Sequence, residues 1–144
     1  MDVVVGVDDS ARTETVLRAA IKEAQLRQAK LHVVHVMQMP TMWVDGMTAI
    51  PSDFMDTSVD LAQKMRSALW DRVKVVLADN PVEWVQIDRT GYPPDELVEY
   101  VKSIDAGLVI VGSRGLGDLR SLLLGSTSHR VSHLSPCDVL IIKT

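Results

Sequence analysis

Glycines and hydroxyl side chains gather in the last third of the chain, and together they could bind a phosphate group. Glycine lets a backbone adopt positive φ and approach a ligand without an intervening Cβ, and several N–H groups turned to one side form an anion site. A helix that begins near Ser126 adds unpaired N–H groups and the positive end of its dipole. Arg114 and Arg120 could add positive charge or face water. The residues concerned are Gly112, Gly115, Gly117, Gly125, Ser126, Thr127 and Ser128.

Two well-known phosphate-binding patterns do not match this loop. A P-loop requires a lysine directly after its last glycine, but no lysine lies between Lys102 and Lys143. The dinucleotide fingerprint requires a third glycine three residues after the second, and Arg120 holds that place after Gly117. Glycine-rich loops often only turn the chain, so composition alone leaves phosphate binding open.

A second group of polar residues, Asp8, Asp9 and Ser10, directly follows the β-branched run at residues 3–7. Such a run is typical of a strand that is buried on both faces. Ligands of an open parallel sheet bind beyond the carboxyl ends of its strands, where Gly112 also lies. Aspartate and serine are also common helix N-caps, so a cap and a ligand contact are alternatives for Asp8.

Strand and helix patterns alternate along the chain, which predicts βαβ crossovers and a parallel sheet. Short runs of valine, isoleucine and leucine indicate strands, and apolar residues at helical spacing indicate the helices between them. Residues 38–57 are rich in proline and methionine, and we expect a structureless functional or mobile segment there, with the methionines of residues 37–65 filling the core. The expected strands are 3–7, 31–36, 82–87, 108–111 and 139–142, and the expected helices are 10–28, 59–77, 94–101 and 126–134.

The bulk composition predicts one domain, residues 1–144, in the cytoplasm. Hydrophobic residues make up 47% of the 144 residues, and the net charge of −4 gives no general attraction to nucleic acid or anionic membrane. The apolar runs are far shorter than the roughly 20 residues that cross a bilayer. The first residues show no basic leader, and the single cysteine excludes an internal disulfide.

The histidines and the cysteine are assigned structural roles. His129 and His133 are four residues apart, but the chain offers no third metal ligand, so we expect solvated helix residues. His32 and His35 are expected to cap the ends of their strand or to pair locally. Cys137 has no evident activating partner and is expected to pack.

The glycine spacing resembles the signature of a known family. Gly112-x-x-Gly115, then nine residues, then Gly125-Ser126 is similar to the Gly-2x-Gly-9x-Gly-Ser/Thr motif of the ATP-binding branch of the universal stress protein family. The resemblance covers the whole chain, and it includes Val7-Asp8-Asp9-Ser10, the strand at 31–36, the Gly91-Tyr92-Pro93 turn and the segment 135–139.

This resemblance implies an α/β fold of the adenine nucleotide alpha-hydrolase-like type. Its open five-stranded parallel sheet would have the order 3-2-1-4-5, with four helices on both faces. The resemblance gives Asp8 a role near the ribose and adenosine end, and Val36 a backbone contact to adenine. The implied cofactors are ATP and Mg²⁺. The implied phosphate-binding residues are Gly112, Arg114, Gly115, Gly125, Ser126 and Thr127.

The implied function is that of an ATP-binding stress regulator. Nucleotide occupancy would order the 112–128 loop and change which protein partner is bound. A homodimer through the last strand is expected, since that strand has no charge in its middle to prevent pairing. The alternatives are a slow ATPase or phosphotransferase that uses Asp9, Asp118 and Arg114, a binder of AMP or cyclic AMP, and a nucleotide-free dimerisation scaffold.

Overall fold

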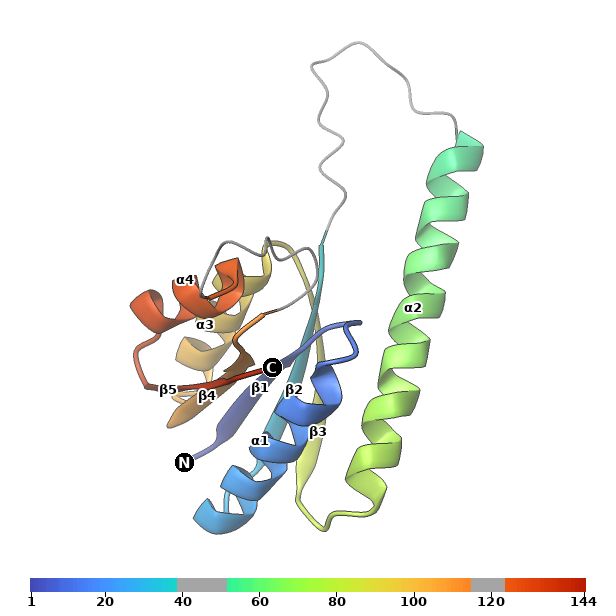
Figure 1. The fold of residues 1–144 in the computed structure, drawn as a ribbon. Coiled ribbons are helices and arrows are strands. Elements are labelled where there is room, and N and C mark those ends of the chain that lie inside the picture. Colours follow the sequence, from blue (N-terminus) through green and yellow to red (C-terminus); the bar gives the residue numbers. More distant parts are fainter. Residues whose placement is uncertain (39–51, 115–123) are drawn as a thin grey trace.

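The computed structural model describes residues 1–38, 52–114 and 124–144 (Figure 1). Within these residues the strands form one parallel sheet in the order β3-β2-β1-β4-β5. The predicted α/β class and strand order are confirmed. The elements are β1 (Val3–Val7), α1 (Thr13–Arg27), β2 (Leu31–Met37), α2 (Ser52–Ala78), β3 (Trp84–Thr90), α3 (Pro93–Ser103), β4 (Leu108–Gly112), α4 (Ser126–Leu134) and β5 (Asp138–Ile142).

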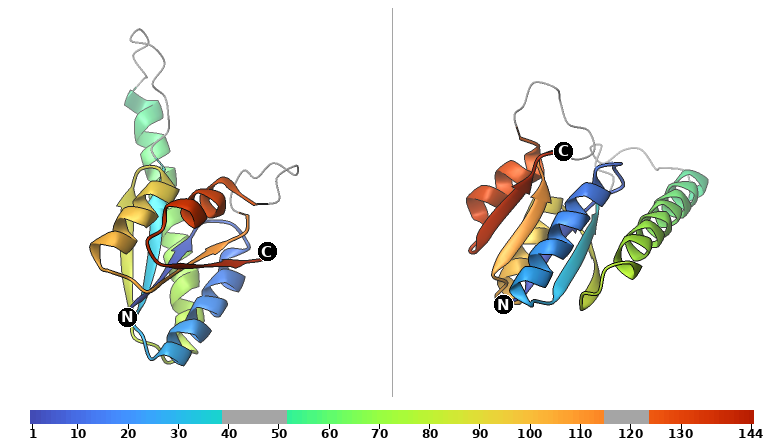
Figure 2. Two further views of the ribbon diagram at one scale, coloured as in Figure 1. Left: turned by 90° about the vertical axis from the view of Figure 1, so that its left-hand side faces the viewer. Right: turned by 60° about the horizontal axis from the view of Figure 1, so that its bottom comes forward.

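Helices cover both faces of the sheet, as the sequence predicts (Figure 2). Successive side chains of a strand point to opposite faces, so Val3 and Val5 of β1 join one core with α1 and α2. Val4 joins a second core with α3 and α4. The central strands β1 and β4 are buried on both sides, which explains their nearly continuous runs of valine and isoleucine.

The edge strand β3 differs from its predicted range. The prediction placed this strand at residues 82–87, whereas the structure has Trp84–Thr90. Its polar end is held by pairing with β2, whose Met37 lies opposite Thr90. Backbone hydrogen bonding therefore extends the strand over residues whose side chains do not signal it.

Helix α2 begins earlier than predicted. It starts at Ser52, so the expectation of no regular structure is wrong for residues 52–57, and residues 39–51 lie outside the described residues. Serine is a common residue at a helix start. The prediction placed the start of the helix too late because the proline and methionines near Ser52 were interpreted as part of a loop.

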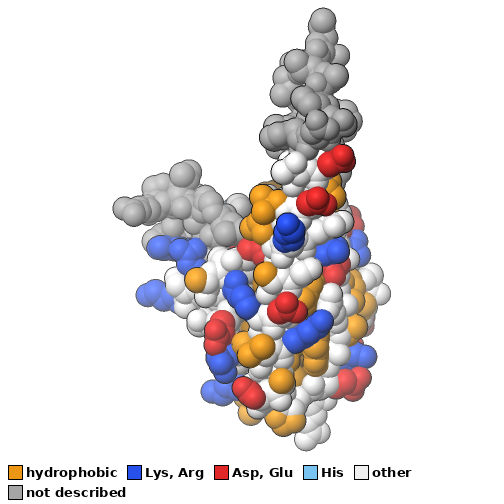
Figure 3. Space-filling model, turned by 90° about the vertical axis from the view of Figure 1, so that its right-hand side faces the viewer, with side chains coloured by type: hydrophobic (Ala, Val, Ile, Leu, Met, Phe, Trp, Pro, Cys, Tyr) orange, Lys and Arg blue, Asp and Glu red, His pale blue; other side chains and the backbone are white. Residues whose placement is uncertain are grey.

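The first half of α2 extends past the carboxyl edge of the sheet (Figure 1). Its 27 residues span about 40 Å as a helix, whereas a strand of seven residues spans about 23 Å. Val59, Leu61 and Met65 in this half are 51%, 58% and 45% exposed, so the prediction of core filling is wrong for Met65. Figure 3 shows hydrophobic side chains interspersed with charged ones on the α2 side of the molecule. No described helix is long and apolar enough to span a bilayer.

We predict that replacing Ile110 by alanine destabilises the fold strongly. Ile110 is fully buried in β4, and removing such a side chain ordinarily costs about 2–5 kcal/mol. Val75 on α2 is 68% exposed, so Val75→Ala should change the stability by no more than about 0.5 kcal/mol. Urea unfolding of both variants measures the difference, and equal losses of stability would contradict the described core.

Candidate functional site

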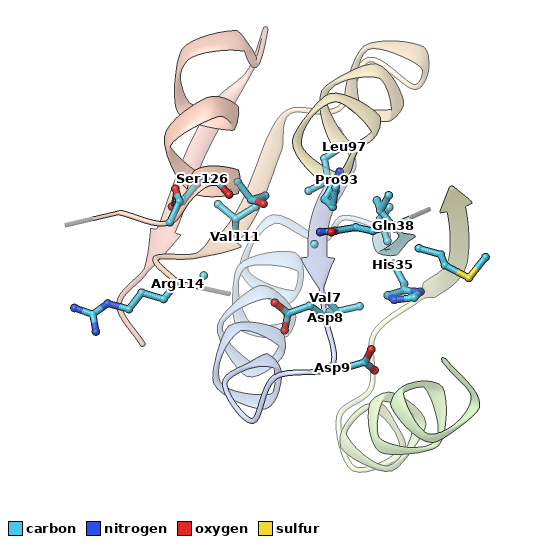
Figure 4. Close-up of a pocket in the computed structure, with 18 of the residues that line it drawn as sticks. Val7, Asp8, Asp9, His35, Gln38, Pro93, Leu97, Val111, Arg114 and Ser126 are labelled. Carbon is cyan, nitrogen blue, oxygen red and sulfur yellow. Dashed lines mark hydrogen bonds between the residues drawn. The ribbon is translucent and has the colours of Figure 1, made fainter. Parts of the chain in front are cut away.

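A cavity of about 460 Å³ lies at the carboxyl ends of β1, β2 and β4 (Figure 4). Its remaining walls come from the starts of α3 and α4 and from the overhanging half of α2. β2 and β3 lie on one side of β1 in the sheet, and β4 and β5 lie on its other side. The cavity therefore lies at the point where the strand order reverses. Open α/β sheets bind their ligands at this point, and pockets of about 300–1,000 Å³ suit small molecules.

Seven of the eight residues predicted to bind the ligand line this one cavity. The eighth, Gly115, lies outside the described residues. Figure 4 shows Arg114 and Ser126 on one side of the cavity and His35 and Gln38 on the other. The seven lining residues are Asp8, Val36, Gly112, Arg114, Gly125, Ser126 and Thr127.

Asp8 stabilises the turn after β1 and does not cap α1. Its Oδ1 accepts a hydrogen bond from the Ser10 N–H at 2.9 Å, and its carbonyl accepts one from the Thr13 hydroxyl at 2.6 Å. The N-cap of α1 is Arg12, which makes no side-chain capping bond. The cap alternative is therefore wrong. Within the described part of the chain Oδ2 of Asp8 has no hydrogen-bond partner, so this oxygen is available to a ligand.

Ser113 holds both ends of the glycine-rich loop together. Its carbonyl accepts hydrogen bonds from the Gly125 N–H at 2.6 Å and from the Ser128 hydroxyl at 3.2 Å. Its own N–H donates to the Ile142 carbonyl at 2.7 Å, and the Thr144 N–H donates to its hydroxyl at 3.1 Å. The start of α4 is thereby fixed against the end of β4, and both are fixed against β5.

The N-terminus of α4 gives one end of the cavity a positive electrostatic character. The N-cap is Gly125, no side chain caps the helix, and its first turn contains no acidic residue. The first N–H groups therefore remain for solvent or a ligand, and they carry the positive end of the helix dipole. The exposed side chain of Arg114 lies at the same end. This end of the cavity is suited to an anion.

Gly112 allows the backbone of β4 to pass close to its neighbours at this end. A Cβ on this residue would lie 3.1 Å from the Arg114 carbonyl oxygen and 3.1 Å from a Val16 methyl group. Both contacts are tighter than ordinary van der Waals distances, so a larger residue would displace the loop or α1. Position 112 of the predicted motif therefore requires glycine for a steric reason.

The other end of the cavity contains His35, whose role the sequence prediction missed. His35 has a 9% exposed side chain, and its Nδ1 lies 3.5 Å from Oδ1 of Asp88 on β3. Strand capping and local pairing were the expectations for the two histidines of β2; His35 lies opposite Asp88 of the neighbouring strand, and His32 contacts Asp2 and Tyr100. The sequence offered one indication that His35 lies in the site, because this residue directly precedes Val36 near the end of a strand.

Asp88 is held by two further donors. The Trp70 indole N–H donates to Oδ1 at 3.0 Å, and the Gln86 amide donates to Oδ2 at 3.1 Å. Burial raises the pKa of Asp88, but these hydrogen bonds, the nearby charge of Arg66 and the contact with His35 outweigh it and lower that pKa below 3.8. Asp88 is therefore ionised at neutral pH.

Other lining residues also escaped prediction. Ala62 and Met65 of α2 and Pro93 and Leu97 of α3 give the cavity apolar walls. They come from helices whose placement over the sheet edge cannot be read from local patterns. Their contribution makes one side of the cavity suitable for a flat, largely apolar group.

The other assigned residues have structural roles. His129 and His133 are exposed with ring centroids 4.7 Å apart, as expected for a helix surface. The described residues contain no cluster of three or more metal-ligating side chains. Cys137 packs partly buried against the second core, which confirms its packing role.

Together, the strand order and the switch-point cavity define an α/β protein with the adenine nucleotide alpha-hydrolase-like fold. The chain belongs to the universal stress protein family, whose model matches residues 1–143. The universal stress protein YxiE of Bacillus subtilis is 32% identical over 142 residues, which cover 96% of both proteins. Rv2005c of Mycobacterium tuberculosis is 34% identical over 146 residues, which cover 98% of this chain and 45% of that longer relative.

Solved structures agree with this assignment. UspA from Lactobacillus plantarum gives a TM-score of 0.78 at 22% identity, covering 99% of this chain and 97% of that one. A universal stress protein from Archaeoglobus fulgidus in complex with dAMP gives 0.66 at 25% identity, with coverages of 99% and 98%. A universal stress protein in complex with cAMP gives 0.65 at 26% identity, with coverages of 99% and 96%.

We predict that Asp88→Asn lowers the stability at pH 6 and that this loss shrinks by pH 3. The folded pKa of Asp88 is lowered, so its contribution to stability is present above the unfolded value and is lost as the pH falls below about 3.8. Urea unfolding of the wild type and the variant at both pH values measures the gap. The exposed Asp71→Asn is the matched control, and a gap for Asp88→Asn that is independent of pH would contradict the interpretation.

Proposed function

We propose that this chain binds an adenine nucleotide in the switch-point cavity and acts as a nucleotide-dependent regulatory module. The observation that carries the proposal is the polarity of the cavity. One end combines a helix N-terminus with Arg114, and the other contains His35 and Asp9 (Figure 4). A nucleotide has the same division between its phosphates and its nucleoside. The dAMP and cAMP complexes of related proteins support this choice of ligand.

The phosphates are proposed to bind at the α4 end. Gly112 and Gly125 leave room for close backbone approach, and Ser126 and Thr127 add hydroxyl donors beside the free N–H groups. Arg114 adds a full positive charge. Gly115 completes the proposed set by its place in the motif, which also supports membership of the ATP-binding branch.

The nucleoside is proposed to bind between β2 and α3. Val36 offers backbone groups at the end of β2, and Leu97 and Pro93 offer apolar surface to the base. The unpartnered Oδ2 of Asp8 is an acceptor for a ribose hydroxyl. This arrangement uses Asp8 and Val36 in the roles that the family resemblance implies.

ATP with Mg²⁺ is the proposed ligand, with AMP and cyclic AMP as the alternatives. Mg²⁺ ordinarily keeps several waters and binds largely through substrate phosphates, so it is proposed to bridge phosphate oxygens and to neutralise their charge. No protein ligand is assigned to it, because Asp8 is assigned to the ribose.

The assembly and setting follow from the same proposal. A homodimer is proposed through β5, which lies at the sheet edge and has half-buried apolar residues over 139–142. A cytoplasmic location and a regulatory protein partner stay predictions. Slow ATP hydrolysis stays the alternative activity, with Asp9 and Arg114 in the cavity wall and Asp118 outside the described residues.

We predict that Ser126→Asp weakens nucleotide binding without destabilising the protein. The new carboxylate would lie in the first turn of α4, where it should stabilise the helix by about 0.3–1 kcal/mol. It would repel a bound phosphate and weaken ATP binding about tenfold or more. Calorimetric titration with ATP, AMP and cyclic AMP in Mg²⁺, together with thermal unfolding, measures both effects.

The matched control is Ser67→Asp, which adds the same charge at an exposed position of α2 outside the cavity lining. Its nucleotide affinity should equal that of the wild type. If the wild type gives no heat with any of the three nucleotides at millimolar concentration, the proposed function is wrong. If Ser126→Asp binds ATP as well as Ser67→Asp does, the phosphates do not bind at α4.

A further inference from the structure

His35 is a buried polar side chain whose hydrogen bonds are not satisfied within the described structure. Its side chain is 9% exposed, and it lines the cavity at the end of β2. Nδ1 is fully buried, and its 3.5 Å contact with Asp88 does not meet hydrogen-bond geometry. Buried polar groups of this kind are rare and call for a physical explanation.

The surroundings of Asp88 define which nitrogen of His35 carries the proton. The Asp88 carboxylate accepts hydrogen bonds from Trp70 and Gln86, so it is fixed in place as an acceptor. An ionised carboxylate next to Nδ1 favours the tautomer in which Nδ1 is protonated. The edge-on ring of Trp70, with centroids 6.5 Å apart, limits rotation of the imidazole.

This tautomer leaves Nε2 as a hydrogen-bond acceptor. Nδ1 is fully buried and has no hydrogen-bond partner in the described residues. Nε2 also has no such partner but is not fully buried, and because His35 lines the cavity, Nε2 is accessible to a ligand there. Figure 4 shows His35 and Asp9 on the side of the cavity away from Arg114 and Ser126. The acceptor therefore lies at the proposed nucleoside end and not at the proposed phosphate end.

We propose that His35 determines ligand specificity by accepting a hydrogen bond from a donor group on the nucleoside half of the ligand, and that Asp88 is its positioning residue. The inference rests on the proposed nucleotide-binding function and assigns a residue to the recognition of the nucleoside. Asp9 lies at the same end (Figure 4), and its carboxylate offers further acceptor oxygens. A ligand rich in donors at this end would satisfy all of them.

Two parts of an adenine nucleotide supply such a donor: a ribose hydroxyl and the exocyclic amino group of the base. Both offer the same chemistry to Nε2, and nucleotide analogues separate them. 2′-Deoxy-ATP and 3′-deoxy-ATP each lack one hydroxyl, and inosine triphosphate lacks the amino group. The analogue that lacks the donor used by His35 should bind the wild type about threefold to tenfold more weakly than ATP does.

The test compares His35→Gln with His35→Asn by calorimetric titration at pH 8. Glutamine can place an acceptor oxygen near the position of Nε2, whereas asparagine reaches only the position of Nδ1 and keeps the contact with Asp88. His35→Gln should bind ATP within about twofold of the wild type. His35→Asn should lose about threefold to tenfold and should no longer distinguish ATP from the relevant analogue.

If His35→Asn binds ATP as tightly as the wild type does, and if the affinity for each analogue relative to ATP is also unchanged, His35 does not recognise the ligand. The proposed function would then still stand. If the wild type binds no adenine nucleotide at millimolar concentration, the proposed function itself fails. Circular dichroism of both variants establishes that they are folded before the titrations are compared.

The positioning role of Asp88 has a spectroscopic readout that a merely structural role would not change. In the ¹⁵N spectrum of the histidine rings, His35 should show the Nδ1-protonated tautomer, and its Nε2 signal should move when ATP is added. Asp88→Asn should shift the tautomer balance and weaken ATP binding. The ratio of the affinities for ATP and for adenosine, which lacks the phosphates, should not change. An unchanged tautomer in Asp88→Asn would overturn the positioning role.

Discussion

The hydrogen bond from the Gly125 N–H to the Ser113 carbonyl, at 2.6 Å, holds the candidate site together. It brings the start of α4 back to the end of β4, although the two are separated by the glycine-rich loop. The same carbonyl receives the Ser128 hydroxyl, and the Ser113 N–H is bonded to β5. The positive end of α4 is therefore directed at the cavity by contacts with the end of β4.

The second constraint is the parallel sheet itself. Because β1 lies between β2 and β4, the turn that contains Asp8 opens between the end of β2 and the start of α4. His35 and Asp9 lie on one side, and the backbone donors of α4 with Arg114 lie on the other (Figure 4). A ligand with a negatively charged end and a donor-rich end matches this division, and this match is the physical basis of the proposed function.

Local patterns predicted the alternation of strands and helices, and the family resemblance, with its motif spacing, predicted the strand order and seven of the lining residues. Gly112, Gly125 and Ser126 belong to such a motif. His35 was missed because its partner, Asp88, belongs to another strand and comes next to it only through the β2–β3 pairing. Met65 was assigned to the core because its apolar character gives no sign that its part of α2 extends past the sheet.

Backbone amide NMR of the ¹⁵N-labelled protein, titrated with ATP and Mg²⁺, can locate the bound nucleotide. The largest chemical-shift changes should fall on Asp8, Val36, Gly112, Ser126 and Thr127, which line the cavity. Changes confined to the β5 edge or to the outer face of α2, or no change at millimolar ATP, would show that the nucleotide does not bind in this cavity.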